Sequence, residues 1–395
     1  MPRDRLSGNE AVAQALRQVN PDVMAAFPIT PSTEIPQYFS SFVADGKVDT
    51  VFVPVESEHS AMSACIGSEA AGARTVTATS SAGLALMWEE LYVAASDRLP
   101  IVLALVNRAL TGPININCDH SDSMGARDAG WIQIYSENNQ EAYDNLIQAF
   151  RIGEDDDVRL PVMVCQDGFI TSHAVENIEL MEDAAVKAFA GNYEPADSLL
   201  NPEKPLSLGP YATSAYYLEH KRSQAEAMRR AKDVILDVAA EFGGISGRNY
   251  GLFEAYRLED AEYAMVLIGS AAGTGKEAVD ELRNKGVKAG LLKIRVFRPF
   301  PAAEIAAALK GCKAVAVMDR AESFSGNGGP LAAEVRGALY HAGAKPSVFP
   351  YVYGLGGRDV RVEDLKSVFE ALPQQDAKPY RYLSVRSEGG EDNGL

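Results

Sequence analysis

The sequence predicts an α/β protein built from two units, each a parallel sheet covered by helices. Short runs of apolar or β-branched residues alternate with helical segments through the first half, as they do where strands are buried on both faces of a parallel sheet. The same alternation returns in the second half. The chain has 395 residues, which is longer than one hydrophobic core usually supports.

The first half contains five predicted strands, each a short apolar or β-branched run next to a turn or a helical segment. These strands are 23–28, 50–55, 74–79, 101–106 and 161–165. Helical segments lie between them at 61–72 and 84–95. Strands that alternate with helices in this way predict βα units and a parallel sheet with helices on both faces.

The character of the sequence changes between 184 and 246. Residues 199–217 are rich in Pro, Ser and Tyr with little periodicity, which indicates a long connection, whereas 218–242 carries apolar residues at helical spacing. We therefore expect a first domain over 1–240, with the linker inside about 184–246.

A second, smaller α/β domain is expected over 249–380, followed by a polar, Gly-rich tail at 381–395. The predicted strands of the second domain are 263–270, 288–296, 314–318 and 347–353.

Charge and composition exclude several classes of protein. The formal net charge is −17 and no basic run is present, which argues against binding to nucleic acid. The N-terminus lacks an apolar signal-peptide core, and no apolar stretch approaches the ~20 residues that span a bilayer. We expect a cytoplasmic protein that binds neither nucleic acid nor membrane.

The four cysteines, Cys65, Cys118, Cys165 and Cys312, are scattered and form no C-x-x-C pair. A zinc ribbon or a cysteine-bound iron–sulfur cluster within this chain is therefore not expected. If the protein takes part in electron transfer, its clusters lie on another chain.

Two polar motifs suggest chemistry that their spacing does not support. The segment 269–276 resembles a phosphate loop, but Ser270 stands where the first Gly is required and Glu277 where Ser or Thr would bind magnesium. We interpret it as the turn between a strand and a helix. The segment 119–122, Asp-His-Ser-Asp, lacks a nucleophile elbow and a second His at ligand spacing, which favours a polar loop lining a pocket over a metal site or a hydrolase triad.

The segment Glu56-Ser57-Glu58-His59 follows a predicted strand and precedes a helix of small residues. Carboxylates at i and i+2 share one face of a strand end. Chemistry in open α/β sheets occurs at the carboxyl ends of the strands, so this pair is the first candidate for a catalytic site.

Taken together, several segments resemble the α subunit of the pyruvate:ferredoxin oxidoreductase family and its 2-oxoacid relatives. The resemblance covers nearly the whole chain and includes the second half. The segments that carry it are 27–34, 55–61, 70–74, 77–84, 107–110, 113–115, 119–122, 127–131, 167–169, 319–320 and 354–359.

The resemblance implies a fold and an activity. The fold is a pyrimidine-type thiamine-enzyme domain followed by a smaller domain similar to the C-terminal domain of transketolase. The activity is the oxidative decarboxylation of pyruvate with coenzyme A to acetyl-CoA and CO2, with reduction of ferredoxin. Three alternatives stay open: the same chemistry on 2-oxoglutarate or on a branched-chain or aryl 2-oxoacid, a non-catalytic interaction subunit, and a stand-alone thiamine enzyme.

The resemblance also implies roles for individual residues. Glu58 matches the glutamate that activates thiamine diphosphate through N1′ of its aminopyrimidine, with Glu56 as a competitor whose neighbours fit the motif less well. Arg108 matches the arginine that grips the 2-oxoacid carboxylate, and Thr30 the threonine that hydrogen-bonds the substrate. Pro28, Ile29 and Ser81 join Glu58 in the expected cofactor site.

The motifs that are missing imply partners. A G-D-G motif followed by Asn would bind Mg²⁺ and the diphosphate, but Asp167-Gly168 lacks the leading Gly. We therefore expect no metal on this chain and a thiamine diphosphate shared with a β subunit, with Mg²⁺ and the [4Fe–4S] clusters on the β subunit and on a ferredoxin-like δ subunit, beside a γ subunit. The loop 111–118 departs from the family near Asn117 and Cys118, which puts the substrate's side chain in doubt.

Overall fold

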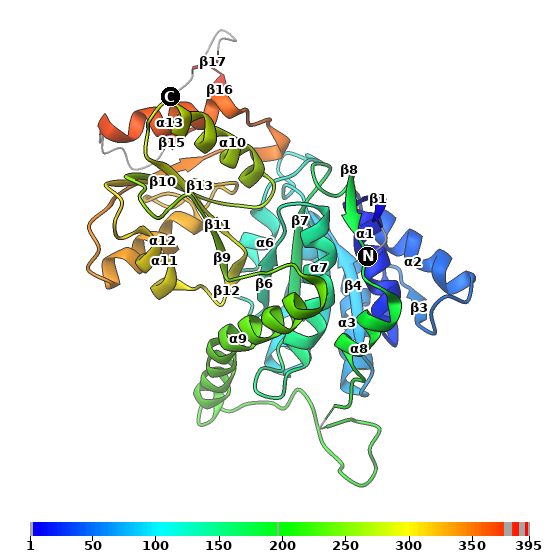
Figure 1. The fold of residues 1–395 in the computed structure, drawn as a ribbon. Coiled ribbons are helices and arrows are strands. Elements are labelled where there is room, and N and C mark those ends of the chain that lie inside the picture. The colour runs from blue at the N-terminus through cyan, green and yellow to red at the C-terminus, as the bar shows by residue number, and fades with distance from the viewer. Residues whose placement is uncertain (1–2, 196, 375–380, 387–391, 394–395) are drawn as a thin grey trace.

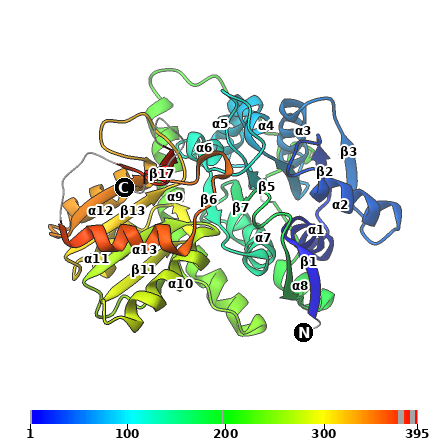
Figure 2. The same cartoon turned by 90° about the horizontal axis from the view of Figure 1, so that it is seen from above.

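The computed structural model describes residues 3–195, 197–374, 381–386 and 392–393. Two sheet-containing units lie side by side, the first blue to green and the second yellow to red (Figure 1; Figure 2). No helix among these residues has the length and apolar character needed to span a bilayer.

The sheet of the first unit has seven strands in the order β12-β6-β7-β5-β4-β2-β3. Their bounds are β2 Val23–Ala26, β3 Val51–Pro54, β4 Thr75–Thr79, β5 Val102–Asn107, β6 Ile132–Tyr135, β7 Val162–Asp167 and β12 Val296–Arg298. All neighbours in this sheet are parallel except β12, which runs antiparallel to β6. The central strands are wholly buried, which explains their unbroken apolar or β-branched sequence.

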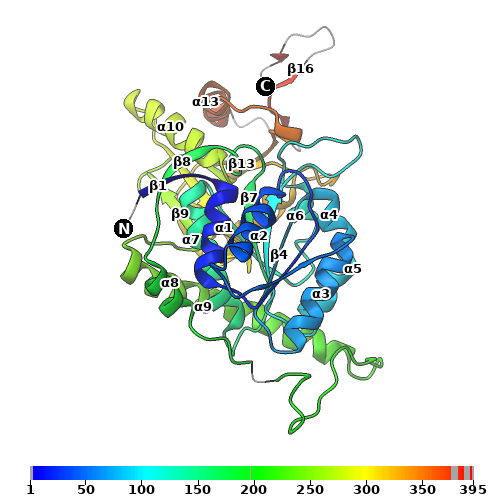
Figure 3. The same cartoon turned by 90° about the vertical axis from the view of Figure 1, so that its right-hand side faces the viewer.

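Helices cover both faces of this sheet (Figure 3). On one face lie α1 Gly8–Val19, α2 Glu34–Ala44, α7 Asn139–Glu154 and α8 Asp183–Ala190. On the other lie α3 Glu58–Ala70, α4 Ser81–Leu86, α5 Trp88–Ser96 and α6 Ser121–Gly125. A short antiparallel pair, β1 Arg3–Ser7 and β8 Val175–Glu179, stands apart from the main sheet.

The sheet of the second unit has the order β15-β14-β13-β10-β11-β9, with only β9 antiparallel to its neighbour. Its strands are β9 Phe253–Tyr256, β10 Tyr263–Ile268, β11 Ala289–Ile294, β13 Ala314–Asp319, β14 Ser347–Val352 and β15 Arg381–Tyr382. Its helices are α10 Ala271–Asn284, α11 Ala302–Leu309, α12 Pro330–His341 and α13 Val362–Ala371. A turn of 3-10 helix, Leu355–Gly357, follows β14, another, Leu372–Gln374, follows α13, and β16 Val385–Arg386 pairs with β17 Asp392–Asn393.

The long helix α9, Tyr217–Ser246, follows an irregular connection whose described residues are 191–195 and 197–216. The sequence predicted a connection at 199–217 and a helix at 218–242. The helix packs against α7, and its apolar residues are part of the hydrophobic core of the first unit. The second core of buried residues is continuous from α3 and α5 into the second unit, since it includes Leu292 and Leu331. The proposed division near 240–249 therefore stays a prediction, and residues 387–391 and 394–395 of the proposed tail lie outside the described residues.

Two predicted elements differ in the structure. The helix expected at 84–95 is two helices, because the backbone at Met87 (φ −91°, ψ 16°) leaves the helical region between α4 and α5. The strand expected at 288–296 ends at Ile294, and Val296–Arg298 then joins the sheet of the first unit.

Candidate active site

Four of the predicted site residues follow four neighbouring strands at one edge of the first sheet. Thr30 follows β2, Glu58 follows β3, Ser81 follows β4 and Arg108 follows β5. Since these strands are parallel, their carboxyl ends meet at the same edge. The four residues, which lie far apart in the sequence, therefore form a single row along this edge.

Glu58 is the first residue of α3, and Ser57 caps that helix by accepting a hydrogen bond from the Ser60 amide at 3.2 Å. The Glu58 side chain is 6% exposed. Within the ranges that the structure describes, no hydrogen bond or ion pair engages its carboxylate. A buried carboxylate usually has a partner, so Glu58 is available to a ligand.

The space beside Glu58 depends on Gly83. A Cβ at position 83 would lie 2.7 Å from Glu58 Oε1 and 2.3 Å from Thr79 Oγ1. The buried hydroxyls of Thr79 and Ser80 also have no hydrogen-bond partner among the described residues. Glycine at position 83 is therefore needed for α4 to approach Glu58 and Thr79 this closely.

Glu56 and His59, which flank Glu58 in the motif, are both exposed. Glu56 is exposed and accepts a hydrogen bond from the Ser60 hydroxyl, which holds the pKa of its carboxyl below the usual range. His59 Nε2 lies 3.3 Å from Glu90 Oε1. Of the two carboxylates in the motif, only Glu58 is buried.

Arg108 and Thr30 lie in direct contact. The Arg108 guanidinium is buried and donates from Nη1 to the Thr30 carbonyl (2.9 Å) and from Nε to the Asn115 carbonyl (3.1 Å). Over the described residues it pairs with no carboxylate, and its Nη2 has no partner. Arg108 therefore forms no structural ion pair within the described part of the chain, and Nη2 remains free to bind an anion. Pro28 and Thr30 are exposed on the same turn, and Ile29 is half-buried.

Asp122 organises this edge, a role that we did not predict from the sequence. Its Oδ2 accepts hydrogen bonds from the Ser81 amide (3.0 Å) and the Arg108 amide (2.9 Å), and its Oδ1 accepts from Asn107 Nδ2 (2.8 Å). It thereby holds Ser81, whose φ is +45°, beside the end of β5. Asp122 belongs to the polar segment 119–122, which the sequence analysis singled out. The sequence did not show that this segment connects the ends of β4 and β5.

Burial raises the pKa of Asp122 to about 6, against the hydrogen bonds from Arg108, Asn107 and Ser81. Protonation as the pH falls through 6 removes an acceptor that holds two site residues, so kcat/KM is expected to decline there. The free energy of unfolding should instead rise as the pH falls through 6, because a raised carboxyl pKa means that the folded state binds the proton more tightly than the unfolded state. In Asp122→Asn, kcat/KM should no longer decline near pH 6, and its value above pH 6 should be lower than that of the wild type. Rates and melting temperatures from pH 5 to 8 measure both; an unchanged decline in Asp122→Asn would contradict the assignment.

A second buried hub joins this edge to the second unit. Asp167, at the end of β7, pairs with His120 Nε2 (2.7 Å) and Arg320 Nη1 (2.9 Å), and it accepts a hydrogen bond from the Ser270 amide (3.0 Å). Burial opposes ionisation of Asp167, but His120 and Arg320 outweigh it and hold its pKa well below the usual range. The turn at 269–276 is thus a strand–turn–helix junction, as predicted, and its Ser270 binds a carboxylate of this chain.

Cys118, His120 and Asp167 lie close enough to hold a metal ion, with their donor atoms within 4.8 Å of one another. The Arg320 guanidinium already supplies a positive charge to Asp167. Burial raises the pKa of the Cys118 thiol well above its usual range, so without a metal ion the sulfur is a neutral thiol beside the Asp167–Arg320 ion pair.

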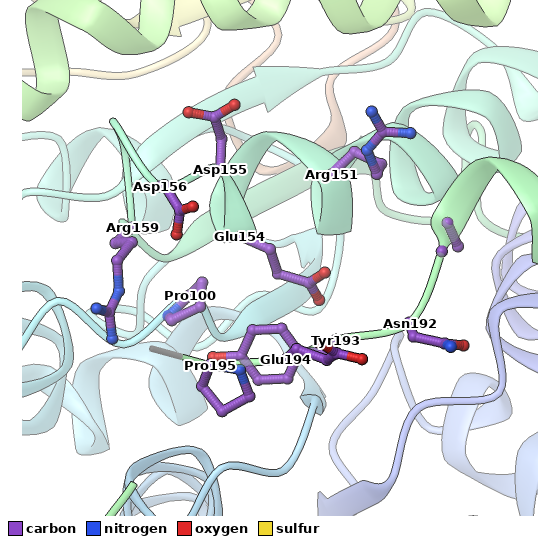
Figure 4. Close-up of a pocket in the computed structure, with 12 residues that line it drawn as sticks. Pro100, Arg151, Glu154, Asp155, Asp156, Arg159, Asn192, Tyr193, Glu194 and Pro195 are labelled. Atoms are coloured by element: carbon purple, nitrogen blue, oxygen red, sulfur yellow. The ribbon is translucent and has the colours of Figure 1, made fainter. Parts of the chain in front are cut away.

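The cavity in Figure 4 lies at the opposite edge of the sheet, beside Pro100, which precedes β5. Its volume is about 380 Å³. Three of its charged lining residues form ion pairs: Glu154 with Arg74, Arg151 with Glu241 and Arg159 with Asp197. Asp155, Asp156 and Glu194 also line it. None of the predicted site residues lines it, so it is separate from the candidate active site.

Comparison with known proteins supports the resemblance. Residues 14–240 match the family model described as pyruvate flavodoxin/ferredoxin oxidoreductase, thiamine diphosphate-binding, and residues 261–365 match that of pyruvate:ferredoxin oxidoreductase core domain II. The pyruvate synthase subunit PorA of Thermotoga maritima is 54% identical over 97% of this chain and 98% of its own length. The ketoisovalerate oxidoreductase subunit VorA of Pyrococcus abyssi is 46% identical over 93% of this chain and 92% of its own.

A solved structure shares the fold. The 2-oxoglutarate:ferredoxin oxidoreductase from Magnetococcus marinus, with 2-oxoglutarate, coenzyme A and succinyl-CoA bound, superposes with a TM-score of 0.73 at 20% identity. The match covers 93% of this chain and 65% of that chain. The predicted fold class is confirmed, and the chain belongs to the pyruvate:ferredoxin oxidoreductase family.

Proposed function

We propose that this chain is the α subunit of a pyruvate:ferredoxin oxidoreductase, an enzyme that converts pyruvate and coenzyme A to acetyl-CoA and CO2 and reduces ferredoxin. The observation that carries the proposal is the row formed by Thr30, Glu58, Ser81 and Arg108 at one sheet edge. Identity to pyruvate synthase subunits over nearly the full chain supports it. We expect the protein in the cytoplasm.

The residues around Glu58 fit an aminopyrimidine ring. The Glu58 carboxylate is buried without a partner among the described residues, and Gly83 has no side chain that would crowd it. Thiamine diphosphate supplies the carbanion chemistry when bound. Glu58 would hold a proton at N1′ of the ring, in a dry site where that hydrogen bond is stronger than in water. Pro28, Ile29 and Ser81 would line the same cofactor.

Arg108 would bind the carboxylate of the 2-oxoacid. Two of its donors are fixed on backbone carbonyls, which leaves Nη2 and one N–H of Nη1 for the substrate. A guanidinium presents its N–H groups in a planar fork that suits a carboxylate. Thr30 lies beside it, exposed, and would add a hydrogen bond from its hydroxyl.

The exposed surface around the candidate active site is consistent with a partner chain that completes this site. Several large apolar side chains near the carboxyl edge are exposed: Leu86 (52%), Trp88 (40%), Ile114 (73%) and Ile116 (47%). Exposed apolar groups gathered in one region mark a protein interface. We propose that a β subunit covers this region and carries Mg²⁺, the diphosphate site and cluster cysteines, with γ and ferredoxin-like δ subunits completing the enzyme and ferredoxin as electron acceptor.

The substrate is tested with the assembled complex. We expect kcat/KM to be highest for pyruvate in a panel that also contains 2-oxoglutarate, a branched-chain 2-oxoacid and an aryl 2-oxoacid. The branched-chain acid is the sharpest competitor, since the VorA relative shares 46% identity. One added methylene changes binding by only about 1–3 kcal/mol in an apolar pocket, so quantitative rates are needed. If pyruvate were the poorest substrate, the proposal would be wrong in its substrate and intact in its chemistry.

A further inference from the structure

The second unit reaches into the active site of the first through one glycine turn. This turn, Leu355–Gly357, follows β14 and is preceded by Gly354. Gly356 and Gly357 have positive φ values of +58° and +79°. A Cβ at Gly356 would lie 2.5 Å from Asn115 Nδ2, and one at Gly357 would lie 2.4 Å from Asn117 Cβ. Both glycines are therefore needed for the turn to approach the loop that follows Arg108.

Hydrogen bonds fasten the loop to the turn. Asn115 Nδ2 donates to the Gly356 carbonyl (3.0 Å), and the Gly357 amide donates to the Cys118 carbonyl (2.7 Å). The Gly356 amide donates to Asp119 Oδ2 (3.2 Å). Of the other side chains of the loop, Ile114 and Ile116 are exposed, whereas Cys118 at its end is buried.

Asn115 connects this turn to Arg108. Its side-chain amide binds the second unit, its Oδ1 accepts from the Asn117 amide (2.7 Å), and its backbone carbonyl accepts from Arg108 Nε (3.1 Å). Arg108 Nη1 in turn donates to the Thr30 carbonyl. An unbroken series of contacts thus runs from Gly356 through Asn115 and Arg108 to Thr30.

We propose that Asn115 is a positioning residue, through which the second unit fixes the guanidinium of Arg108 in the orientation that binds the substrate carboxylate. The inference rests on the proposed role of Arg108 and extends it. An arginine side chain has many rotamers, and holding it on two carbonyls before the substrate arrives removes that entropy from the cost of binding. The second unit then contributes to substrate affinity although it supplies no group to the reacting atoms.

The test is a double-mutant cycle in the assembled complex. Asn115→Ala is expected to raise the KM for the 2-oxoacid about tenfold, the order expected when one polar contact is lost, with kcat changed less than about threefold. Arg108→Ala should raise KM further. If Asn115 acts through Arg108, the double variant Arg108→Ala/Asn115→Ala should be no worse than Arg108→Ala alone. Additive effects on KM, or a fall in kcat as large as the rise in KM, would overturn the proposal.

Two further variants separate this role from general damage to the loop. Gly356→Ala approaches Asn115 from the other side of the contact and should reproduce its rise in KM from the second unit. Asn327→Ala is the matched control, since Asn327 is an exposed asparagine whose side chain has no hydrogen bond within the described ranges. Its KM should be unchanged. If Arg108→Ala itself leaves KM unchanged, the proposed function of Arg108 fails, whatever Asn115 does.

Discussion

Glu58→Gln is expected to lower turnover of the assembled enzyme at least about a hundredfold, the lower end of what a positioned general base contributes. Glutamine keeps the shape of the side chain but carries no charge, so it cannot hold the proton that a carboxylate shares with a ring nitrogen. Measured rates of CO2 and acetyl-CoA formation at saturating substrate give the loss directly.

Folding and assembly should survive this change. The Glu58 carboxylate is buried and makes no hydrogen bond or ion pair to the residues that the structure describes. Removing a buried charge that has no partner takes away a desolvation cost, so the free energy of unfolding should stay level or rise. Size-exclusion chromatography and a melting curve establish that the loss of turnover comes from chemistry.

Glu56→Gln is the matched control. The two residues stand two positions apart at the same strand end, but Glu56 is exposed and bonded to Ser60. Its turnover should stay within about twofold of wild type, as expected of a surface substitution. If Glu58→Gln were fully active, the chain would be a non-catalytic interaction subunit, and the role of Glu58 would be rejected.

Arg108→Ala is expected to raise the KM for the 2-oxoacid by about 10- to 150-fold, because hydrogen bonds to charged groups are worth about 1.5–3 kcal/mol. The effect should fall mainly on KM and kcat/KM, since the carboxylate keeps its charge throughout the reaction. Initial rates over a wide range of substrate concentration separate the two constants.

Arg108→Lys distinguishes charge from geometry. Lysine keeps the positive charge but has no planar fork, so it cannot donate to the Thr30 and Asn115 carbonyls and to both oxygens of a carboxylate. It should recover only part of the lost affinity. A variant with normal KM and reduced stability would assign Arg108 a structural role instead.

The sequence indicates where the proposed site residues lie, although their roles, which the family resemblance implies, stay predictions. The residues Thr30, Glu58, Ser81 and Arg108 each follow a strand with a clear apolar pattern, and the rule that parallel strands share a carboxyl edge brings them together. The shared face expected for Glu56 and Glu58 was wrong, because β3 ends at Pro54 and Glu58 already begins α3. Glu58 is buried, whereas Glu56 is exposed in the turn before that helix.

Contacts between distant parts of the chain could not be predicted in this way. Asp122 holds Ser81 across 41 positions of sequence, and Asn115 meets Gly356 across 241. No periodicity encodes such pairings, because they depend on how loops from different strands meet. The three-residue strand Val296–Arg298 was missed because it is too short for a pattern and continues directly from a predicted strand of the other sheet.

That short strand affects how the first sheet can form during synthesis of the chain. It pairs with β6 at the end of the first sheet, although its residues follow β9, β10 and β11 of the second sheet. A nascent chain that has emerged only as far as α9 would leave β6 as an open edge, and unpaired edges invite association with other chains. The first unit therefore completes its sheet only after much of the second has left the ribosome, and a truncation between the units would remove the strand that protects this edge.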